Sequence, residues 1–202
     1  MPPRKDAGPR AWQRMLSGRR LDLLDPSPLD VELGDIAHGL ARVARWNGQT
    51  LGAHAFSVAQ HSLLVEDIFG LLGEAPSPRD RIAALLHDAA EYVIGDMISP
   101  FKAVVGGGYR EVERRLRHAI HLRFGLKPDL TKKLEARIKR ADQVAAYLEA
   151  TVLAGFSHQE AAAFFGRPNE IAIEHFDVTP LPAEQVQQAF VARFAALEAL
   201  KG

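Results

Sequence analysis

The feature that most constrains this chain is a succession of long helical patterns with almost no strand signal between them. The longest is "LTKKLEARIKRADQVAAYLEATVLAG" at residues 130–155, and it follows helical patterns over 33–46, 56–72, 77–93 and 109–124. In these segments apolar residues recur at the spacing of one helix face. "SGRRLDLL" near the N-terminus is a weak strand signal that permits a short β-hairpin. The sequence therefore predicts an all-α fold with, at most, that minor hairpin.

The length of 202 residues fits one domain with a sizeable core. We expect a single helical domain over residues 1–202, with its central part at 33–155. Residues 1–30 are rich in Pro and Arg and are expected to form an irregular extension. "SHQE" at 157–160 is a capping box that opens a short helix. Residues 183–200 form an amphipathic helix, which is expected to pack on the core or to form an oligomer surface.

The composition excludes several classes of site. Cysteine is absent, which rules out disulfides, thiolate zinc sites and cysteine nucleophiles. Any metal must therefore be held by His, Asp and Glu. The formal net charge of zero argues against a nucleic-acid polymer as partner. No apolar run approaches ~18 residues and no signal peptide is recognisable, so we expect a cytoplasmic protein that does not bind a membrane.

An apolar stretch at residues 83–96, "AALLHDAAEYVIGD", carries four ionisable side chains: His87, Asp88, Glu91 and Asp96. On helical spacing Asp88 lies on the apolar side of the segment, and Glu91 reaches the same region. An isolated buried carboxylate costs several kcal/mol unless it is paired, coordinated or protonated. Either this stretch frays into solvent or a cation lies against it, although a His-Asp dipeptide alone is weak evidence.

Two other helical patterns also turn an ionisable group inward. His61 lies in the apolar stripe of residues 56–72, where a lone His is more often a hydrogen-bonded core residue than a ligand. Asp142 faces the buried side of residues 130–155, and Lys139 could pair with it instead of a metal. A metal site with two His and two Asp ligands explains all of these positions together. By contrast, His118 and His121 fall on the Arg-rich side of residues 109–124 and are expected to be solvated or to face a partner.

The order His61, His87-Asp88, Asp142 resembles the H…HD…D signature of the HD-domain metal-dependent phosphohydrolases. "SVAQHSLLV", "LLHDAAEYVIGDMISPFK" and "IKRADQVAAYLEA" look like the branch that contains the bacterial HD-domain 5′-nucleotidases. "DIAHGLARVARWNG" is similar to the Arg-aromatic segment of that branch. The resemblance covers roughly residues 30–155 and implies a single HD-domain helical bundle.

The resemblance also implies roles for individual residues. One divalent metal ion (Mn, Co, Ni, Fe, Mg or Zn) would be held by His61, His87, Asp88 and Asp142. Glu91 and Asp96 match the acids placed beside the metal for catalysis. Arg45 matches the phosphate-contacting Arg and Trp46 the residue beside the sugar, whereas a core aromatic is the alternative for Trp46. Lys102 is a second candidate phosphate contact, with a solvated loop Lys as the alternative.

The activity that the resemblance implies is hydrolysis of nucleoside or deoxynucleoside 5′-monophosphates by metal-activated water. The expected partner is therefore a small phosphorylated substrate, and a homodimer is the oligomeric state that the family suggests. Two alternatives stay open. One is a non-catalytic nucleotide-binding or regulatory module. The other is a binuclear HD oxygenase or phosphodiesterase, which needs extra inward His residues between the His-Asp pair and the last Asp.

Overall fold

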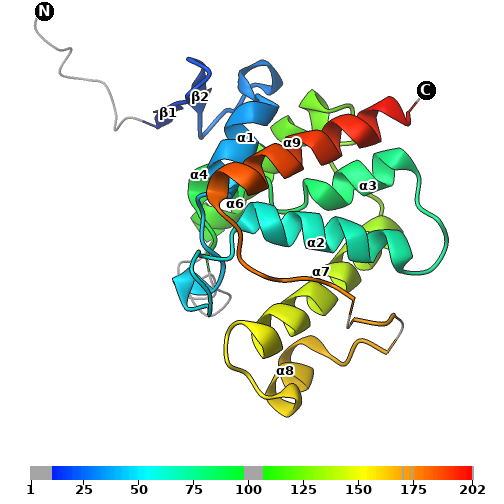
Figure 1. The fold of residues 1–202 in the computed structure, drawn as a ribbon. Helices are drawn as coiled ribbons and strands as arrows, with labels where there is room; N and C mark the ends of the chain where they lie inside the picture. Colours follow the sequence, from blue (N-terminus) through cyan, green and yellow to red (C-terminus); the bar gives the residue numbers. More distant parts are fainter. Residues whose placement is uncertain (1–10, 98–106, 170, 174, 202) are drawn as a thin grey trace, which may run out of the picture.

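The computed structural model describes residues 11–97, 107–169, 171–173 and 175–201. Within these residues the regular elements are helices apart from one two-stranded N-terminal hairpin, which confirms the predicted all-α class (Figure 1). The helices are α1 (Leu33–Leu40), α2 (Val58–Leu71), α3 (Pro78–Leu85), α4 (Glu91–Ile94), α6 (Gly107–Arg123), α7 (Lys132–Val152), α8 (His158–Phe165) and α9 (Ala183–Ala199). Two short 3-10 helices, η1 (Pro28–Asp30) and η2 (Arg45–Gly48), lie in the connections.

The N-terminal hairpin that the sequence permitted is present. Strands β1 (Trp12–Arg14) and β2 (Arg20–Asp22) pair antiparallel, with Trp12 opposite Asp22. Ser17 in the connecting turn donates its hydroxyl to Asp35 of α1 over 2.5 Å. This contact joins the hairpin to the helical domain.

Helix α2 runs through the middle of the bundle and packs against α7 on one side and against α3 and α9 on the other (Figure 1). Its residues Val65, Ile68 and Phe69 are fully buried in the core. Helix α9 buries Phe190 and Phe194 in the same core, so its amphipathic pattern reflects packing within the domain. The predicted helices at 56–72, 109–124, 130–155 and 183–200 are thus all confirmed, with small shifts at their ends.

A buried ion-pair cluster ties three helices together. Glu66 of α2 is fully buried and pairs with Arg81 of α3 and with Arg193 of α9. Arg193 also pairs with Asp67 at 2.6 Å. Because an unpaired buried carboxylate is costly, Glu66 favours the packing in which both arginines reach it.

Two predicted helices are interrupted, and both interruptions lie at the candidate site. The segment 77–93 was expected to be one helix, but α3 ends at Leu85 and α4 begins at Glu91. His87 and Asp88 therefore lie in the turn between them. The segment 33–46 was also expected to be continuous, but α1 ends at Leu40. Beyond it, hydrogen bonds with the residues before α2, such as Arg45 N–H to the Phe56 carbonyl at 2.8 Å, replace the helical ones.

The break before α4 is accompanied by a close contact with α1. A Cβ atom at Gly39 would lie 2.8 Å from Cβ of Tyr92 and 2.9 Å from its carbonyl oxygen. Only glycine therefore lets α4 approach α1 this closely. The same contact positions Glu91, which precedes Tyr92 on α4.

None of the helices in the described residues is long and apolar enough to cross a lipid bilayer.

The contact at Gly39 can be tested with a control in the same helix. We expect Gly39→Ala to lower the free energy of unfolding by about 1–3 kcal/mol, because the added methyl group forces α1 and α4 apart. Gly34→Ala, where the methyl group meets open space, should be neutral or stabilising by up to about 1 kcal/mol. Urea denaturation of both variants measures the difference, and equal effects would contradict this packing.

Candidate metal centre

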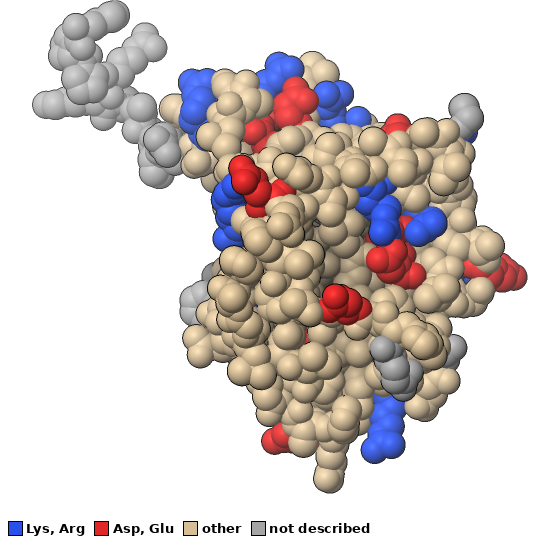
Figure 2. All heavy atoms as spheres, viewed as in Figure 1, with Lys and Arg blue, Asp and Glu red and all other residues tan. Residues whose placement is uncertain are grey.

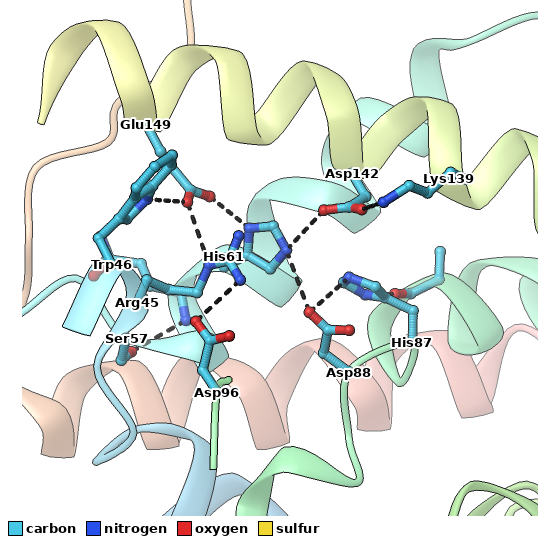
Figure 3. A network of polar contacts seen from close by, with 12 residues as sticks. Arg45, Trp46, Ser57, His61, His87, Asp88, Asp96, Lys139, Asp142 and Glu149 are labelled. Carbon is cyan, nitrogen blue, oxygen red and sulfur yellow. Dashed lines mark hydrogen bonds and ion pairs between the residues drawn. The ribbon is translucent and has the colours of Figure 1, made fainter. Parts of the chain in front are cut away.

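The turn after α3 and the packing of α2 on α7 bring the predicted ligands together. His61 comes from α2, His87 and Asp88 from the turn, and Asp142 from α7 (Figure 3). Among the described residues, His61, His87 and Asp88 form a group whose ligand atoms lie within 4.8 Å of one another. These three residues could hold a metal ion. Asp142 lies beside the group, with Oδ1 3.4 Å from Nε2 of His61.

The imidazole of His61 is fully buried and is oriented by a carboxylate. Its Nδ1 lies 2.5 Å from Oε1 of Glu149. A carboxylate can only accept, so Nδ1 carries a hydrogen and the neutral ring keeps its lone pair on Nε2. That Nε2 faces Asp142 and, at 3.6 Å, Oδ2 of Asp88.

The imidazole of His87 is oriented in the same way by the backbone. Its Nδ1 lies 2.9 Å from the carbonyl oxygen of Ala84, which again places the lone pair on Nε2. This Nε2 lies 3.2 Å from Oδ2 of Asp88. The Nε2 atoms of His61 and His87 are both buried, and neither has a hydrogen-bond partner in the part of the chain that the structure describes. When both rings are neutral, as metal binding requires, two nitrogen lone pairs and a carboxylate converge on one point.

The two oxygens of Asp142 have different neighbours, which match the two roles that the sequence suggested: pairing with Lys139 and metal binding. Oδ2 accepts a hydrogen bond from Lys139 at 2.7 Å, and Oδ1 faces His61. The Lys139 side chain is 67% exposed, so this ion pair is largely solvated and adds little stability. The Lys139 pairing thus leaves one oxygen of Asp142 directed at the cluster.

Charges in the cluster strongly influence one another. Burial raises the pKa of Asp88 and Asp142, but the imidazoles lower it more, so both pKa values lie below the usual range. Burial also raises the pKa of Glu149, but the charges of His61 and Arg45 lower it by more, so the pKa of Glu149 lies below its ordinary value. All three carboxylates are therefore ionised at neutral pH. Burial and the charge of Arg45 lower the pKa of His61, but Glu149 and Asp142 raise it to about 10. The cluster attracts positive charge, whether a proton or a metal ion.

Glu149 is a site residue that the sequence did not indicate. It is fully buried on α7 and contacts His61, Arg45 and Trp46. It follows Asp142 by seven residues, or two helical turns, and so lies on the same face of α7. An acid at that spacing within an otherwise apolar run was the available signal.

Arg45 and Trp46 are held by this network. Nε of Arg45 lies 3.3 Å from Glu149, and Nη1 lies 3.2 Å from Asp96. The Trp46 indole donates to Glu149 at 2.9 Å and packs on the rings of Phe156 and Phe165. Trp46 also has a left-handed backbone, with φ of 56°. The core-aromatic alternative for Trp46 therefore has direct support, whereas its contact with a sugar stays a prediction, as does the contact of Arg45 with a phosphate.

The two predicted catalytic acids closely follow His87 and Asp88 in the sequence. Glu91 is 3% exposed, and its backbone N–H donates to the Asp88 carbonyl at 3.0 Å. Asp96 follows α4 and pairs with Arg45. Lys102 lies outside the described residues.

The expected exposure of His121 is wrong. Its side chain is 1% exposed, and Nδ1 lies 2.9 Å from the carbonyl oxygen of Pro128. Helical spacing placed it opposite Val112, but the chain turns back at Gly125 and covers that side of α6. Burial lowers the pKa of His121, which favours the neutral ring. His118 is half-buried and contacts Asp129 at 2.8 Å.

A cavity of about 310 Å³ opens beside the cluster. It is lined by His87, Asp88, Arg117, His121, Leu130, Glu135, Ile138, Lys139 and Asp142. The metal-ligand candidates thus border a space that a small molecule can occupy.

The role of Glu149 leads to a prediction about metal affinity. Glu149→Gln removes the charge that orients the His61 ring, and we expect metal affinity to fall about 10- to 100-fold. Glu135→Gln removes the same charge from an exposed position on α7 beside the cavity, and should change affinity less than about 2-fold. Isothermal titration of chelator-treated protein with Mn²⁺ and Zn²⁺ gives both values. Equal losses in the two variants would contradict an orienting role.

The raised pKa of His61 predicts a pH-dependent contribution to stability in metal-free protein. The folded-state pKa of about 10 exceeds the ordinary value of 6.5, so protonation of His61 stabilises the fold. This contribution is fully present below pH 6.5 and is lost as pH rises to about 10. The stability difference between wild type and His61→Gln should shrink by roughly 2–5 kcal/mol between pH 6 and pH 10. Denaturant titrations with chelator measure it, and a pH-independent difference would refute the assignment.

Comparison with known protein families gives no matching family model. An uncharacterized protein of Rhodobacter capsulatus is 56% identical over 184 residues, which are 91% of this chain and 94% of that protein. Identity at this level over nearly the whole of both chains means that they share one fold and one ancestor. The chain therefore belongs to the same protein family as this Rhodobacter capsulatus protein.

Proposed function

We propose that this chain is a metal-dependent phosphohydrolase of the HD-domain type. Its substrates are phosphate monoesters, with nucleoside and deoxynucleoside 5′-monophosphates as the first class to test. One observation carries the proposal. The buried Nε2 atoms of His61 and His87 have no hydrogen-bond partner among the described residues, and both point at Asp88.

The donor set fits a divalent metal ion. Two neutral imidazoles and a carboxylate suit Mn, Fe, Co, Ni or Zn, and Oδ1 of Asp142 supplies a fourth donor. The hydrogen bonds from Nδ1 of His61 and His87 to fixed acceptors are the kind of outer support that metal-binding imidazoles have. A metal ion there would lower the pKa of water and neutralise charge on a phosphoryl group.

The protein side chains have defined tasks in this proposal. Glu91 takes a proton from the attacking water as the water oxygen forms a bond to phosphorus. The ester P–O bond breaks and the leaving oxygen takes a proton from solvent water, while Asp96, held beside Arg45, helps to position the attacking water. The cavity of about 310 Å³ is at the small end of ligand pockets, which favours a small ester over a polymer.

The charge distribution supports a small substrate as well. The formal net charge is zero, and Figure 2 shows Lys and Arg beside Asp and Glu on the face that it draws, with no broad area of one sign. A nucleic-acid polymer would need an extended basic surface.

His121 favours a second candidate function. The binuclear alternative requires an additional inward imidazole, and His121 lines the same cavity as His87, Asp88 and Asp142. Because its Nδ1 donates to backbone carbonyls, its Nε2 keeps a lone pair. His121 lies outside the group of three residues whose ligand atoms are within 4.8 Å of one another, so we rank a two-metal phosphodiesterase or oxygenase second.

The proposal predicts metal-dependent release of phosphate from monoesters. We expect chelator-treated protein to be inactive and to regain activity with one metal ion per chain. Glu91→Gln should lower kcat by at least about 100-fold with metal content unchanged, as expected for loss of a general base. Asp88→Asn should lose both metal and activity. The assay follows phosphate released from a panel of ribo- and deoxyribonucleoside 5′-monophosphates with Mn, Co, Ni, Fe, Mg and Zn.

Asp129→Asn is the matched control, because Asp129 is an exposed carboxylate that contacts His118 away from the cluster. It should retain activity. Two metal ions per chain with cleavage of phosphodiesters or uptake of oxygen would favour the binuclear candidate. Bound metal with no turnover of any ester would reject an enzyme and favour a regulatory module.

A further inference from the structure

Arg117 is a half-buried cation that has no ion-pair partner among the described residues. It lies on α6 and lines the cavity beside the metal cluster. No hydrogen bond or ion pair joins its guanidinium to any residue in the described part of the chain, unlike Arg114 and Arg115 on the same helix, which both pair with Glu111. An arginine that is partly removed from water and lacks a carboxylate partner is a ready binding group for an anion.

The position of Arg117 on α6 directs it into the cavity. It precedes His121 by four residues, so the two side chains share one face of the helix. The charge of Arg117 also contributes to lowering the pKa of the His121 imidazole, in keeping with their proximity. His121 is itself a lining residue together with His87 and Asp142. Arg117 and the candidate metal ligands therefore face the same cavity.

Two other basic residues near the cluster, Arg45 and Lys139, already have carboxylate partners. Arg45 has Nε on Glu149 and Nη1 on Asp96, and it is absent from the residues that line the cavity. Lys139 lines the cavity, but its ammonium group is held by Asp142. Among the described lining residues, Arg117 alone offers a cation with no partner.

The charge balance of the cavity depends on the metal. Its wall carries three carboxylates, from Asp88, Glu135 and Asp142, and two cations, from Arg117 and Lys139. Without a metal ion the wall is negative by one charge, and with a divalent ion it is positive by one. A divalent metal ion adds two positive charges, so the metal-loaded cavity attracts an anion more strongly than the metal-free cavity does, with Arg117 as the contact on the protein side.

We propose that Arg117 is the substrate-binding residue of this cavity and contacts the phosphoryl oxygens of a phosphate monoester. This assignment rests on the proposed function, because it takes the metal cluster as the reacting centre. It also assigns an orientation. The phosphoryl group lies between the cluster and Arg117, and the leaving group lies toward Leu130 and Ile138, the apolar side chains of the lining.

Inorganic phosphate is the probe, and Arg114→Gln is the matched control because it removes an exposed arginine from the same helix. Titration of Mn-loaded full-length protein should show phosphate binding weakened about 10- to 100-fold in Arg117→Gln, as expected for loss of a charge-assisted bidentate contact. Arg114→Gln should change it less than about 2-fold. Arg117→Lys should recover part of the affinity. The Kd for Mn²⁺ and the thermal unfolding midpoint should be unchanged in all three variants.

The outcomes separate this assignment from the proposed function. Phosphate binding that depends on Arg117 without hydrolysis of any ester supports the anion site and rejects the enzyme. Hydrolysis with phosphate affinity and KM unchanged in Arg117→Gln overturns the assignment and leaves the enzyme in place. Absence of phosphate binding to metal-loaded wild-type protein also overturns the assignment.

Discussion

The contact between Glu149 and His61 is the interaction on which the candidate site depends. It joins α2 to α7 in the middle of the domain, and both side chains are fully buried. Glu149 fixes the imidazole with Nε2 toward the cluster, and it also holds Arg45 and Trp46. A buried carboxylate needs such partners, because an unpaired one costs several kcal/mol. The same contact therefore stabilises the packing of α2 on α7 and orients the first candidate ligand.

The turn between α3 and α4 positions the other two candidate ligands, His87 and Asp88. In a continuous helix His87 and Asp88 would point about 100° apart around the axis. In the turn at residues 86–90 their side chains come together, with Nε2 of His87 3.2 Å from Asp88. Gly39 allows α4 to pack close to α1 after this turn. The helix is thus interrupted at the place where the candidate ligands come together.

The proposed activity and the proposed role of Arg117 depend on this geometry in different ways. The proposed metal site rests on two buried nitrogen atoms, Nε2 of His61 and Nε2 of His87, that lack hydrogen-bond partners among the described residues. The proposed anion site rests on the Arg117 guanidinium, which lines the cavity and has no hydrogen-bond or ion-pair partner in the described part of the chain. If both proposals hold, the cavity would bind a metal ion at one end and a phosphoryl group beside it. His121 lines the same space, and the number of metal ions bound will decide whether it acts as a lining residue or as a ligand.

The sequence alone determined the helical class, the start of the short helix after the capping box at 157–160, and the inward placement of His61 and Asp142, because these follow from local periodicity and capping chemistry. Tertiary structure alone decided the break before His87, the burial of His121 and the recruitment of Glu149. Helical spacing reports which side of a helix is apolar, but a returning loop can bury a polar side, as residues after Gly125 do for His121. Likewise, a helix is broken when contacts with distant residues, such as Arg45 with Phe56, replace its own hydrogen bonds.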